Sequence, residues 1–567
     1  MAGQAHTPAQ NQLSTRPWFR GAWALLLLLL LLLTAQCRWW PRREPPPAVL
    51  DVHQATLPRM LDPTRAQSIA EMNVTRQLFA GLTRLSADGR DILPDLATEW
   101  KASGDRRIYT FYLRQEAVWV DRQGQAVGPI TADDVVWTFR RLCDPTTGAA
   151  SAPLFYIIEG CEDAHKATGI PDLEGIDVRA VDDFTVEFTL VEPATYFPAL
   201  LTALAARPLP RALIDAAGDA WAKPDALWTS GPYMVREWSA KRALLVQNPL
   251  FFAADEVTVA QVRLHALPEE DALARYDRNQ LDMVLLSPAT TAQFRYDQAR
   301  QPELRAFAEP CSTYAGFVTV NPPLDFRLVR LALSEAIDRD RLVSEVLGGN
   351  ALPARHLTPP GTFGAPPADQ IGVEWNPEHA QDVLARAGYP GGQGFPPLTL
   401  RYPQNVLFEA VARFLARVWE ETLGIEVRLD GRPAETYAQT LERTLPLEEA
   451  PHIWLETTCN PSPDAHHWLS PAFHCEESPN RARRLCNAFD ALLEQAAVEP
   501  DPAKRRELYA QAEDALAVSE VAYAPLYVTT QTALVKPWLQ PAVARADFWE
   551  LRDWSMDMFA KVAAQEE

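Results

Sequence analysis

The sequence predicts an α/β protein with more than one lobe. Its length of 567 residues exceeds what one hydrophobic core holds, and at ~150 residues per domain it suggests three or four lobes. Hydrophobic residues make up 47% and charged residues 22% of the chain, which is typical of folded proteins. Strand-like runs alternate with helical stretches along the chain, which favours the α/β class.

Acidic residues outnumber basic ones. With 53 Lys and Arg against 74 Asp and Glu, the formal net charge is −21, so nucleic acid would be repelled from most of this surface. We therefore expect no nucleic-acid partner, and we interpret the acidity as that of a soluble surface.

An apolar run near the amino terminus predicts export from the cytoplasm. Residues 21–36 carry no charge and include nine successive leucines, Leu25–Leu33, with Arg16 and Arg20 before them. The run is shorter than the ~20 residues that span a bilayer comfortably. Basic residues followed by an apolar stretch are the layout of a signal peptide, or of an uncleaved signal anchor.

Cys37 follows Thr34-Ala35-Gln36, which resembles the cleavage site of a bacterial lipoprotein. Lipidation of Cys37 and an uncleaved anchor (residues 1–36) both place the remaining chain outside the cytoplasm and tether it to the membrane. Residues 37–50 are rich in proline and are expected to form a stiff spacer.

Six further cysteines make an even count, which in an oxidising compartment predicts disulfides. They allow 15 connectivities, and buried free thiols are the alternative. Pairing of sequence neighbours favours Cys143 with Cys161 and Cys475 with Cys486, which leaves Cys311 for Cys459.

Several local elements follow from the residue pattern. Residues 109–113 and 185–190 alternate apolar and polar side chains, as strands do. Thr131 and Asp134 have the spacing of a capping box before a helix.

Asp325 and Asp338 are placed to cap two later helices, the second reaching Leu347. A further helix is expected over residues 503–517, with a strand at 524–528 after it.

Signatures of common enzymes are missing from the sequence. It contains no Gly-x-x-x-x-Gly-Lys-Ser/Thr loop, no Gly-x-Ser-x-Gly elbow and no His-Glu-x-x-His helix, so a bound nucleotide and the two commonest hydrolase sites are not expected. Seventeen tryptophans and paired carboxylates would suit a glycosidase cleft, but we assign most tryptophans to the core.

A cluster of potential metal ligands lies between Cys459 and Cys475, with Asp464, His466 and His467 inside it. Its spacing fits no standard zinc pattern. We therefore interpret the segment as a disulfide-stapled ligand loop and expect no metal and no cofactor.

Together the residues resemble the oligopeptide-binding family of bacterial extracellular solute-binding proteins, family 5. The resemblance spans about Leu61 to Pro537. Its motifs are Leu61-Asp-Pro63, Gly81-Leu82, Tyr109-Thr-Phe, Leu113-Arg114, Trp119, Thr131 to Val135, Asp144-Pro145, Ser230-Gly-Pro-Tyr233, Asn248-Pro249, Arg327 to Arg330, Ala336-Ile-Asp-Arg339, Pro359-Pro360 and Leu534-Val-Lys-Pro537.

The resemblance implies a three-lobed fold of the type II periplasmic binding proteins, with two lobes closing over a ligand. It assigns residues 51–84, 182–308 and 523–567 to lobe I, 85–181 to lobe II and 309–522 to lobe III. It implies a monomeric binding protein, not an enzyme, that delivers an oligopeptide or related small solute to an ABC permease with a separate ATPase. A secreted hydrolase and a signalling-only receptor on the same scaffold are the alternatives.

The resemblance also implies the ligand contacts. A strand edge that pairs with the ligand falls on Gln67, Ser68 and Ile69, and aromatic contacts fall on Tyr314 and Tyr527. The loop from Cys459 through Asn460 to Asp464 contributes the remaining ligand contacts.

This loop departs from the family pattern, because the aspartate that holds a peptide ammonium falls on Pro461. Asp464 is the candidate replacement. An oligosaccharide, a nickel chelate or an opine-like ligand is the alternative.

Overall fold

The computed structural model describes residues 48–86, 91–460, 462–476, 479–541 and 554–556, together with Lys561 and Gln565. The chain divides into two compact units, residues 1–46 and 47–567, and the second unit is described below. The predicted export signal and Cys37 lie outside the described residues. Among the described helices, none is long and apolar enough to cross a membrane.

Two kinds of element alternate along the second unit. The strands are β1 Val49–Gln54, β2 Thr83–Leu85, β3 Ile92–Pro94, β4 Ala97–Ala102, β5 Ile108–Leu113, β6 Val118–Val120, β7 Ala126–Pro129, β8 Val178–Asp182, β9 Thr185–Thr189, β10 Tyr233–Trp238, β11 Arg242–Gln247, β12 Gln261–Ala266, β13 Met283–Leu285, β14 Leu304–Phe317, β15 Ala351–Pro353, β16 Leu398–Pro403, β17 Val427–Arg432, β18 Ile453–Cys459, β19 Tyr523–Val535, β20 Leu539–Pro541 and β21 Trp554–Met556. The helices are α2 Ile69–Leu78, α3 Ala132–Cys143, α4 Cys161–His165, α5 Phe197–Leu200, α6 Arg211–Ala217, α7 Glu269–Asp277, α8 Pro288–Phe294, α9 Arg327–Glu335, α10 Arg339–Glu345, α11 Pro377–Arg386, α12 Val406–Leu423, α13 His466–Phe473, α14 Ala488–Val498 and α15 Pro502–Asp514. This alternation confirms the predicted α/β class.

An eleven-stranded sheet organises most of the unit, in the order β10-β11-β12-β1-β13-β19-β14-β18-β16-β17 with β15 beside β19. Strand β1 lies parallel to both β12 and β13. Five of its six residues are buried, as expected for a parallel strand covered on both faces. Since β1 starts at Val49, the predicted spacer ends before residue 50.

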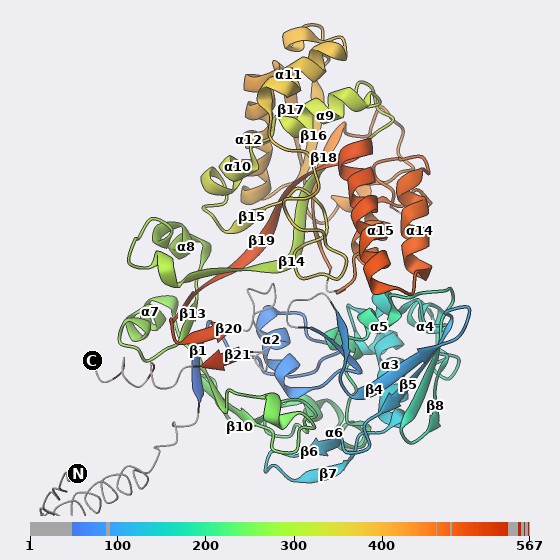
Figure 1. The fold of residues 1–567 in the computed structure, drawn as a ribbon, viewed down its shortest axis with the longest axis vertical. Helices are drawn as coiled ribbons and strands as arrows, with labels where there is room; N and C mark the ends of the chain where they lie inside the picture. Colours follow the sequence, from blue (N-terminus) through green and yellow to red (C-terminus); the bar gives the residue numbers. More distant parts are fainter. Residues whose placement is uncertain are drawn as a thin grey trace, which may run out of the picture. The chain divides into compact units, whose positions relative to one another are not determined.

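Two long strands, β14 and β19, connect the two ends of this sheet. They pair with each other over most of their length. At one end β19 also pairs with β13, and at the other β14 pairs with β18 (Figure 1). Two register shifts interrupt the pairing, and such bulges bend a strand.

A second sheet has the order β4-β5-β9-β8. It contains the strands predicted at 109–113 and 185–190, which the structure confirms as β5 and β9. The predicted lobe boundary at residue 181 falls within β8, and β9 pairs with β5 and β8. The second sheet therefore needs residues that the prediction placed in lobe I, while the lobe division as a whole stays a prediction.

The helices at Thr131, Asp325 and Asp338 were predicted in the right places, but only two of these three residues cap their helix. Helix α3 begins after Thr131 with the predicted capping box, and Asp338 caps α10 by accepting a hydrogen bond from the Arg341 N–H. Asp325 was wrong as a cap, because α9 begins after Phe326 without a side-chain cap. Instead, Arg327 donates to the carbonyls of Val518 and Ser519 and holds the start of α9.

Separate hydrophobic cores lie at the two ends of the β14–β19 pair. The first core collects residues between Leu50 and Met283, together with Phe307 and a few from 533–539. The second core collects residues between Ala315 and Tyr527. A small core around Tyr276 and Val284 includes Leu534 of β19.

All three predicted disulfides are present. Cys143 is bonded to Cys161, Cys475 to Cys486, and Cys311 to Cys459. The last bond joins β14 to β18 at residues that are also paired in the sheet.

Candidate functional site

A cavity of about 1500 Å³ lies where β1, β12 and β13 end. Its wall is built from residues 53, 55–60, 223–225, 238–240, 266–269, 285–287 and Gln531. Ligands of open α/β sheets bind outside the carboxyl ends of parallel strands. The position and size of this cavity therefore make it the candidate binding site.

The wall of the cavity is mostly apolar, with Leu57, Met60, Trp238 and Leu285 among its residues. Charged side chains of both signs also line it, namely Arg59, Lys223, Asp225 and Glu269. Such a mixture is typical of small-molecule sites, where apolar walls give affinity and a few polar groups fix orientation.

His53 is a buried polar residue of the wall, 3% exposed. Its Nε2 lies 2.9 Å from the Leu267 carbonyl oxygen, and its Nδ1 has no hydrogen-bond partner among the described residues. Burial lowers the pKa of His53, so the imidazole is neutral near pH 7.

Gln531 brings the strand β19 into the same cavity. Its Nε2 donates to the carbonyls of Leu286 and Thr532, at 3.5 and 3.3 Å. Glu269 accepts a hydrogen bond of 2.8 Å from the N–H of Ser287, the residue after Leu286. The cavity thus adjoins the long strand pair that connects the two cores.

The expected strand edge at residues 67–69 is wrong, because these residues lead into a helix. Ser68 is the N-cap of α2, and its hydroxyl accepts from the Glu71 N–H. The Glu71 carboxylate accepts from the N–H groups of Gln67 and Ser68, at 3.1 and 3.0 Å. These two donors are therefore already used, although the side chains of Gln67, Ser68 and Ile69 are exposed.

The predicted aromatic contacts, Tyr314 and Tyr527, are each 2% exposed. The Tyr314 hydroxyl donates to Glu456 at 2.9 Å, and Glu456 also pairs with Arg481. Burial raises the pKa of Tyr314 well above its usual value. Both rings belong to hydrophobic cores, so neither offers an open face to a ligand in this structure.

The segment after β18 is held by its own contacts. Cys459 is exposed and bonded to Cys311. Asn460 donates from Nδ2 to the His467 carbonyl at 2.7 Å and accepts at Oδ1 from the Ser462 N–H at 2.9 Å. Ligand contact by Cys459 and Asn460 stays a prediction.

Asp464 does not have the exposure of an ammonium anchor, because its side chain is 0% exposed. It lies 3.4 Å from Arg505 and accepts from the Tyr509 hydroxyl at 2.8 Å and the His466 N–H at 3.0 Å. Burial raises the pKa of Asp464, and Arg505 acts against that rise. Arg505 supplies the counter-charge, and Pro461 lies outside the described residues.

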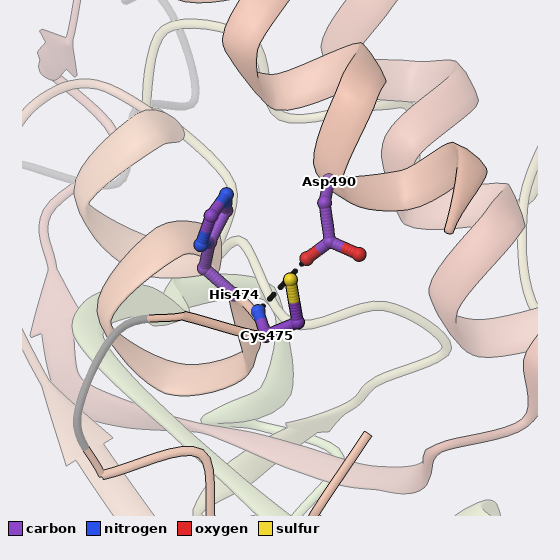
Figure 2. Close-up of side chains that lie close together, drawn as sticks. All are labelled: His474, Cys475 and Asp490. Carbon is purple, nitrogen blue, oxygen red and sulfur yellow. Dashed lines mark hydrogen bonds between the residues drawn. The ribbon is translucent and has the colours of Figure 1, made fainter. Parts of the chain in front are cut away.

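His474, Cys475 and Asp490 bring potential metal-ligand atoms within 4.8 Å of one another (Figure 2). The Cys475 sulfur is bonded to Cys486, and Asp490 accepts from the Cys475 N–H at 2.9 Å. A disulfide sulfur is not a thiolate ligand. This trio is therefore better explained as part of a stapled loop.

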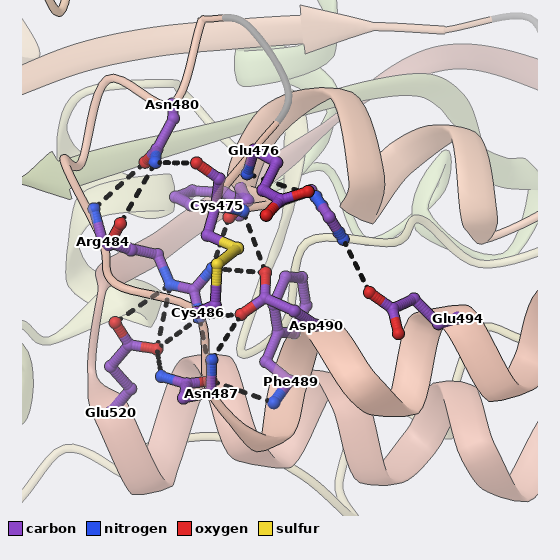
Figure 3. A network of polar contacts seen from close by, with 12 residues as sticks. Cys475, Glu476, Asn480, Arg484, Cys486, Asn487, Phe489, Asp490, Glu494 and Glu520 are labelled. Atoms are coloured by element: carbon purple, nitrogen blue, oxygen red, sulfur yellow. Dashed lines mark hydrogen bonds and ion pairs between the residues drawn. A yellow bond between two sulfur atoms is a disulfide. The ribbon is translucent and has the colours of Figure 1, made fainter.

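Arg484 is the centre of a network of polar contacts in this loop (Figure 3), and its side chain is fully buried. It pairs with Asp490 at 3.2 Å and with Glu520 at 2.8 Å, and it donates to the Asn487 side chain at 3.0 Å. The contacts of Cys475, Arg484 and Asp490 therefore have a structural role.

The cavity lies at the ends of parallel strands, and the long β14–β19 pair beside it connects two hydrophobic cores. This arrangement is that of periplasmic-type binding proteins. The model of "Bacterial extracellular solute-binding proteins, family 5 Middle" matches residues 91–480. The chain belongs to this family of solute-binding proteins.

Curated relatives and solved structures agree with this assignment. The chain is 30% identical to the periplasmic oligopeptide-binding protein OppA of Salmonella typhimurium, over 84% of this chain and 87% of the relative. It is 33% identical to the periplasmic murein peptide-binding protein MppA of Escherichia coli, over 85% and 88%. The unliganded open form of MppA superposes with a TM-score of 0.78 at 28% identity, covering 90% of this chain and 97% of that one.

The sequence did not predict the cavity. Its wall comes from seven separate stretches of chain, which are brought together by the pairing of β1 with β12 and β13. The parallel order of these three strands depends on pairing between distant residues, which residue patterns do not show.

Proposed function

We propose that this solute-binding protein captures a short peptide outside the cytoplasm and delivers it to the transmembrane subunits of an ABC importer, whose separate ATPase supplies the energy. The observation that carries the proposal is the cavity of about 1500 Å³ at the carboxyl ends of β1, β12 and β13. The names of the relatives OppA and MppA support a peptide as the ligand.

The chemistry of the wall suits a zwitterionic peptide. Arg59 and Lys223 offer positive charge, Asp225 and Glu269 offer negative charge, and the apolar residues between them accept varied side chains. Capture then proceeds by bending of the β14–β19 pair. A ligand that contacts residues around both the first and the second hydrophobic core stabilises the closed state over the open one.

We further propose that the protein binds without catalysis. Asp464 faces Arg505, Asp282 faces Lys561 and Asp490 faces Arg484. Each of these buried carboxylates is paired with a cationic side chain, so a structural role explains its burial without a catalytic one.

The anchoring of the protein is also a proposal. We expect the apolar run 21–36 or a lipid on Cys37 to hold the unit beside its permease as a monomer. Radiolabelled fatty acid should enter the wild-type chain and not Cys37→Ser, if Cys37 is lipidated. Membrane retention of both proteins without label would instead identify an uncleaved anchor.

Calorimetric titration with tri- to pentapeptides tests the binding site. Leu285→Trp places a bulky ring in the cavity wall and should weaken peptide binding by at least about tenfold, or ~1.4 kcal/mol. Leu407→Trp is the matched control, because Leu407 is 45% exposed on α12 and lies outside the cavity wall. Equal peptide affinity of wild type and Leu285→Trp would refute this site.

A further inference from the structure

The carboxyl end of helix α14 lies beside α5, and the loop before α5 caps it (Figure 1). The last carbonyls of a helix have no hydrogen-bond partner within it. The Thr195 N–H donates to the Ala497 carbonyl at 2.7 Å, and the Thr195 hydroxyl donates to the carbonyls of Ala497 and Ala496 at 2.9 and 3.3 Å. Helix α14 belongs to a third core, which collects residues between Tyr314 and Tyr523. Thr195 therefore joins the third core to the first core, against which Ala497 also packs.

Two histidines of α13 lie against the same loop. The ring of His466 stacks on the ring of Tyr196, with centroids 4.4 Å apart, and the ring of His467 meets Tyr196 edge-on at 4.9 Å. Tyr196 is buried, and both histidines are only partly exposed. Separation of the loop from α13 would therefore bring both imidazoles into water.

Neither imidazole has a place for an added proton while the contact is closed. The Nδ1 atoms of His466 and His467 are out of reach of solvent and have no hydrogen-bond partner among the described residues. A proton on either atom would be buried without an acceptor, which is unfavourable. Burial lowers the pKa of His466 well below its usual value and the pKa of His467 from 6.5 to about 4. Both rings are therefore neutral near pH 7.

The charged groups of α13 and α15 also oppose protonation. The positive charge of Arg505 and the neighbouring rings of His467 and His474 lower the pKa of His466 further. Arg505 pairs with Asp464 at 3.4 Å, so this carboxylate already has a cationic partner. A protonated histidine would place a second positive charge beside the same pair.

The groups on the remaining sides of the contact do not change this balance. The Tyr109 hydroxyl donates to a carbonyl of the loop at 2.9 Å, and burial raises the pKa of Tyr109 to about 12, so the phenol is neutral. Asp91 pairs with Arg506 at 3.3 Å. Glu494 of α14 lies 3.7 Å from His474, and its side chain is 71% exposed.

We propose that the contact of Thr195 and Tyr196 with α13 and α14, hereafter the latch, is an acid-sensitive fastening between the first and third cores. His466 and His467 each take up a proton when the latch opens, while both cores stay folded. Helices α13, α14 and α15 then move without holding the first core, so the β14–β19 pair bends with fewer contacts to break in acid.

The proton count determines how steeply the latch responds to pH. A histidine that is neutral in the closed latch and protonated in the open latch raises the opening constant about tenfold for each pH unit of acidification. Two such histidines raise it about 100-fold per unit. This response begins as the pH falls below the usual histidine pKa of 6.5 and continues toward the value of about 4 that His467 has in the closed latch.

Amide hydrogen exchange of the full chain in mild detergent tests the latch without any ligand, so its outcome is independent of peptide capture. The probe is the Thr195 N–H, and protection factors, which correct for the intrinsic exchange rate at each pH, give the opening constant. In wild type this constant should rise about 100-fold per unit of acidification between roughly pH 6 and pH 5. The Leu113 N–H, which donates to the Phe184 carbonyl at 2.7 Å within the first core, should keep its protection factor.

Three variants assign the protons to the two histidines. His467→Gln should respond about tenfold per pH unit, and the double variant His466→Gln/His467→Gln should not respond. His165→Gln is the matched control, because His165 also lies against a tyrosine ring, that of Tyr156 at 5.7 Å, but belongs to α4 outside the latch. This control should respond as wild type does.

Three results would each overturn the latch. The first is a Thr195 opening constant that does not change with pH in wild type. The second is an equal response of the Leu113 amide, which would indicate unfolding of the first core instead of opening of the latch. The third is a response that the double variant keeps. The first two comparisons use only wild type, so they hold even if a variant does not fold.

Discussion

Asp464 and Arg505 form a buried ion pair between the loop before α13 and the helix α15. Their side chains are 0% and 5% exposed, and the charged atoms lie 3.4 Å apart. Two charges are removed from water here, and each depends on the other to offset the loss of hydration. The family resemblance made Asp464 the candidate anchor, because a sequence pattern shows a carboxylate but not the arginine that folds onto it.

Asp464→Asn should therefore affect stability and not ligand affinity. Loss of the carboxylate leaves Arg505 buried without its partner, which costs ~3–5 kcal/mol. Urea unfolding and peptide calorimetry measure the two effects. Asp215→Asn is the control, since its pair with Arg211 is more than half exposed and is expected to contribute less than ~1 kcal/mol. A loss of peptide affinity with unchanged stability would restore Asp464 as an anchor.

His467 should make the protein less stable in acid. Burial lowers its pKa from 6.5 to about 4, so the folded state binds fewer protons than the unfolded state between these values. Stability therefore falls as the pH drops from 6.5 to 4, by ~3 kcal/mol in total at ~1.4 kcal/mol per unit. His467→Gln should reduce this fall in urea unfolding curves measured across that range, and an unchanged pH dependence would contradict the assignment.

At the scale of helices and strands, the sequence predicted correctly those features that depend on interactions between neighbouring residues. The capping box of Thr131 and the alternation in β5 and β9 depend on a few neighbouring residues, and the structure confirms them. The cavity, and the pairing of β19 with both β13 and β14, depend on contacts between residues far apart in the chain. Periodicity carries no information about such pairing.

The disulfide between β14 and β18 should contribute more than the one that closes the loop after α13. Cys311 and Cys459 are 148 residues apart, whereas Cys475 and Cys486 are 11 apart. The chain-entropy model gives ~5 kcal/mol for the longer closure and ~3 kcal/mol for the shorter one. Denaturation of the two paired Cys→Ala double variants compares them, and a larger loss for the shorter loop would contradict this order.

At the scale of the second unit, the hydrophobic cores are linked at more than one place. One of these links is the β14–β19 pair. Another joins Thr195 to the end of α14, where the Thr195 N–H donates to the Ala497 carbonyl at 2.7 Å. The stacked rings of Tyr196 and His466 lie beside it, with centroids 4.4 Å apart. Ligand-driven closure must bend the first link and keep or repack the second.

Closure predicts a smaller radius of gyration in small-angle X-ray scattering when peptide is added. The radius falls because a ligand that contacts residues around both the first and the second hydrophobic core favours the closed arrangement. Leu285→Trp provides the control, since it should show no peptide-dependent change. An unchanged radius in the wild type at saturating peptide would contradict capture by closure.

Native mass spectrometry of the purified unit from residue 47 onward tests peptide capture most directly. Denaturation after isolation releases and identifies whatever the protein carried. We predict a monomer that retains one short peptide or a set of them. A protein that retains a single sugar, bile acid or metal chelate instead would contradict the peptide assignment, and one that stays empty with peptide in excess would contradict capture itself.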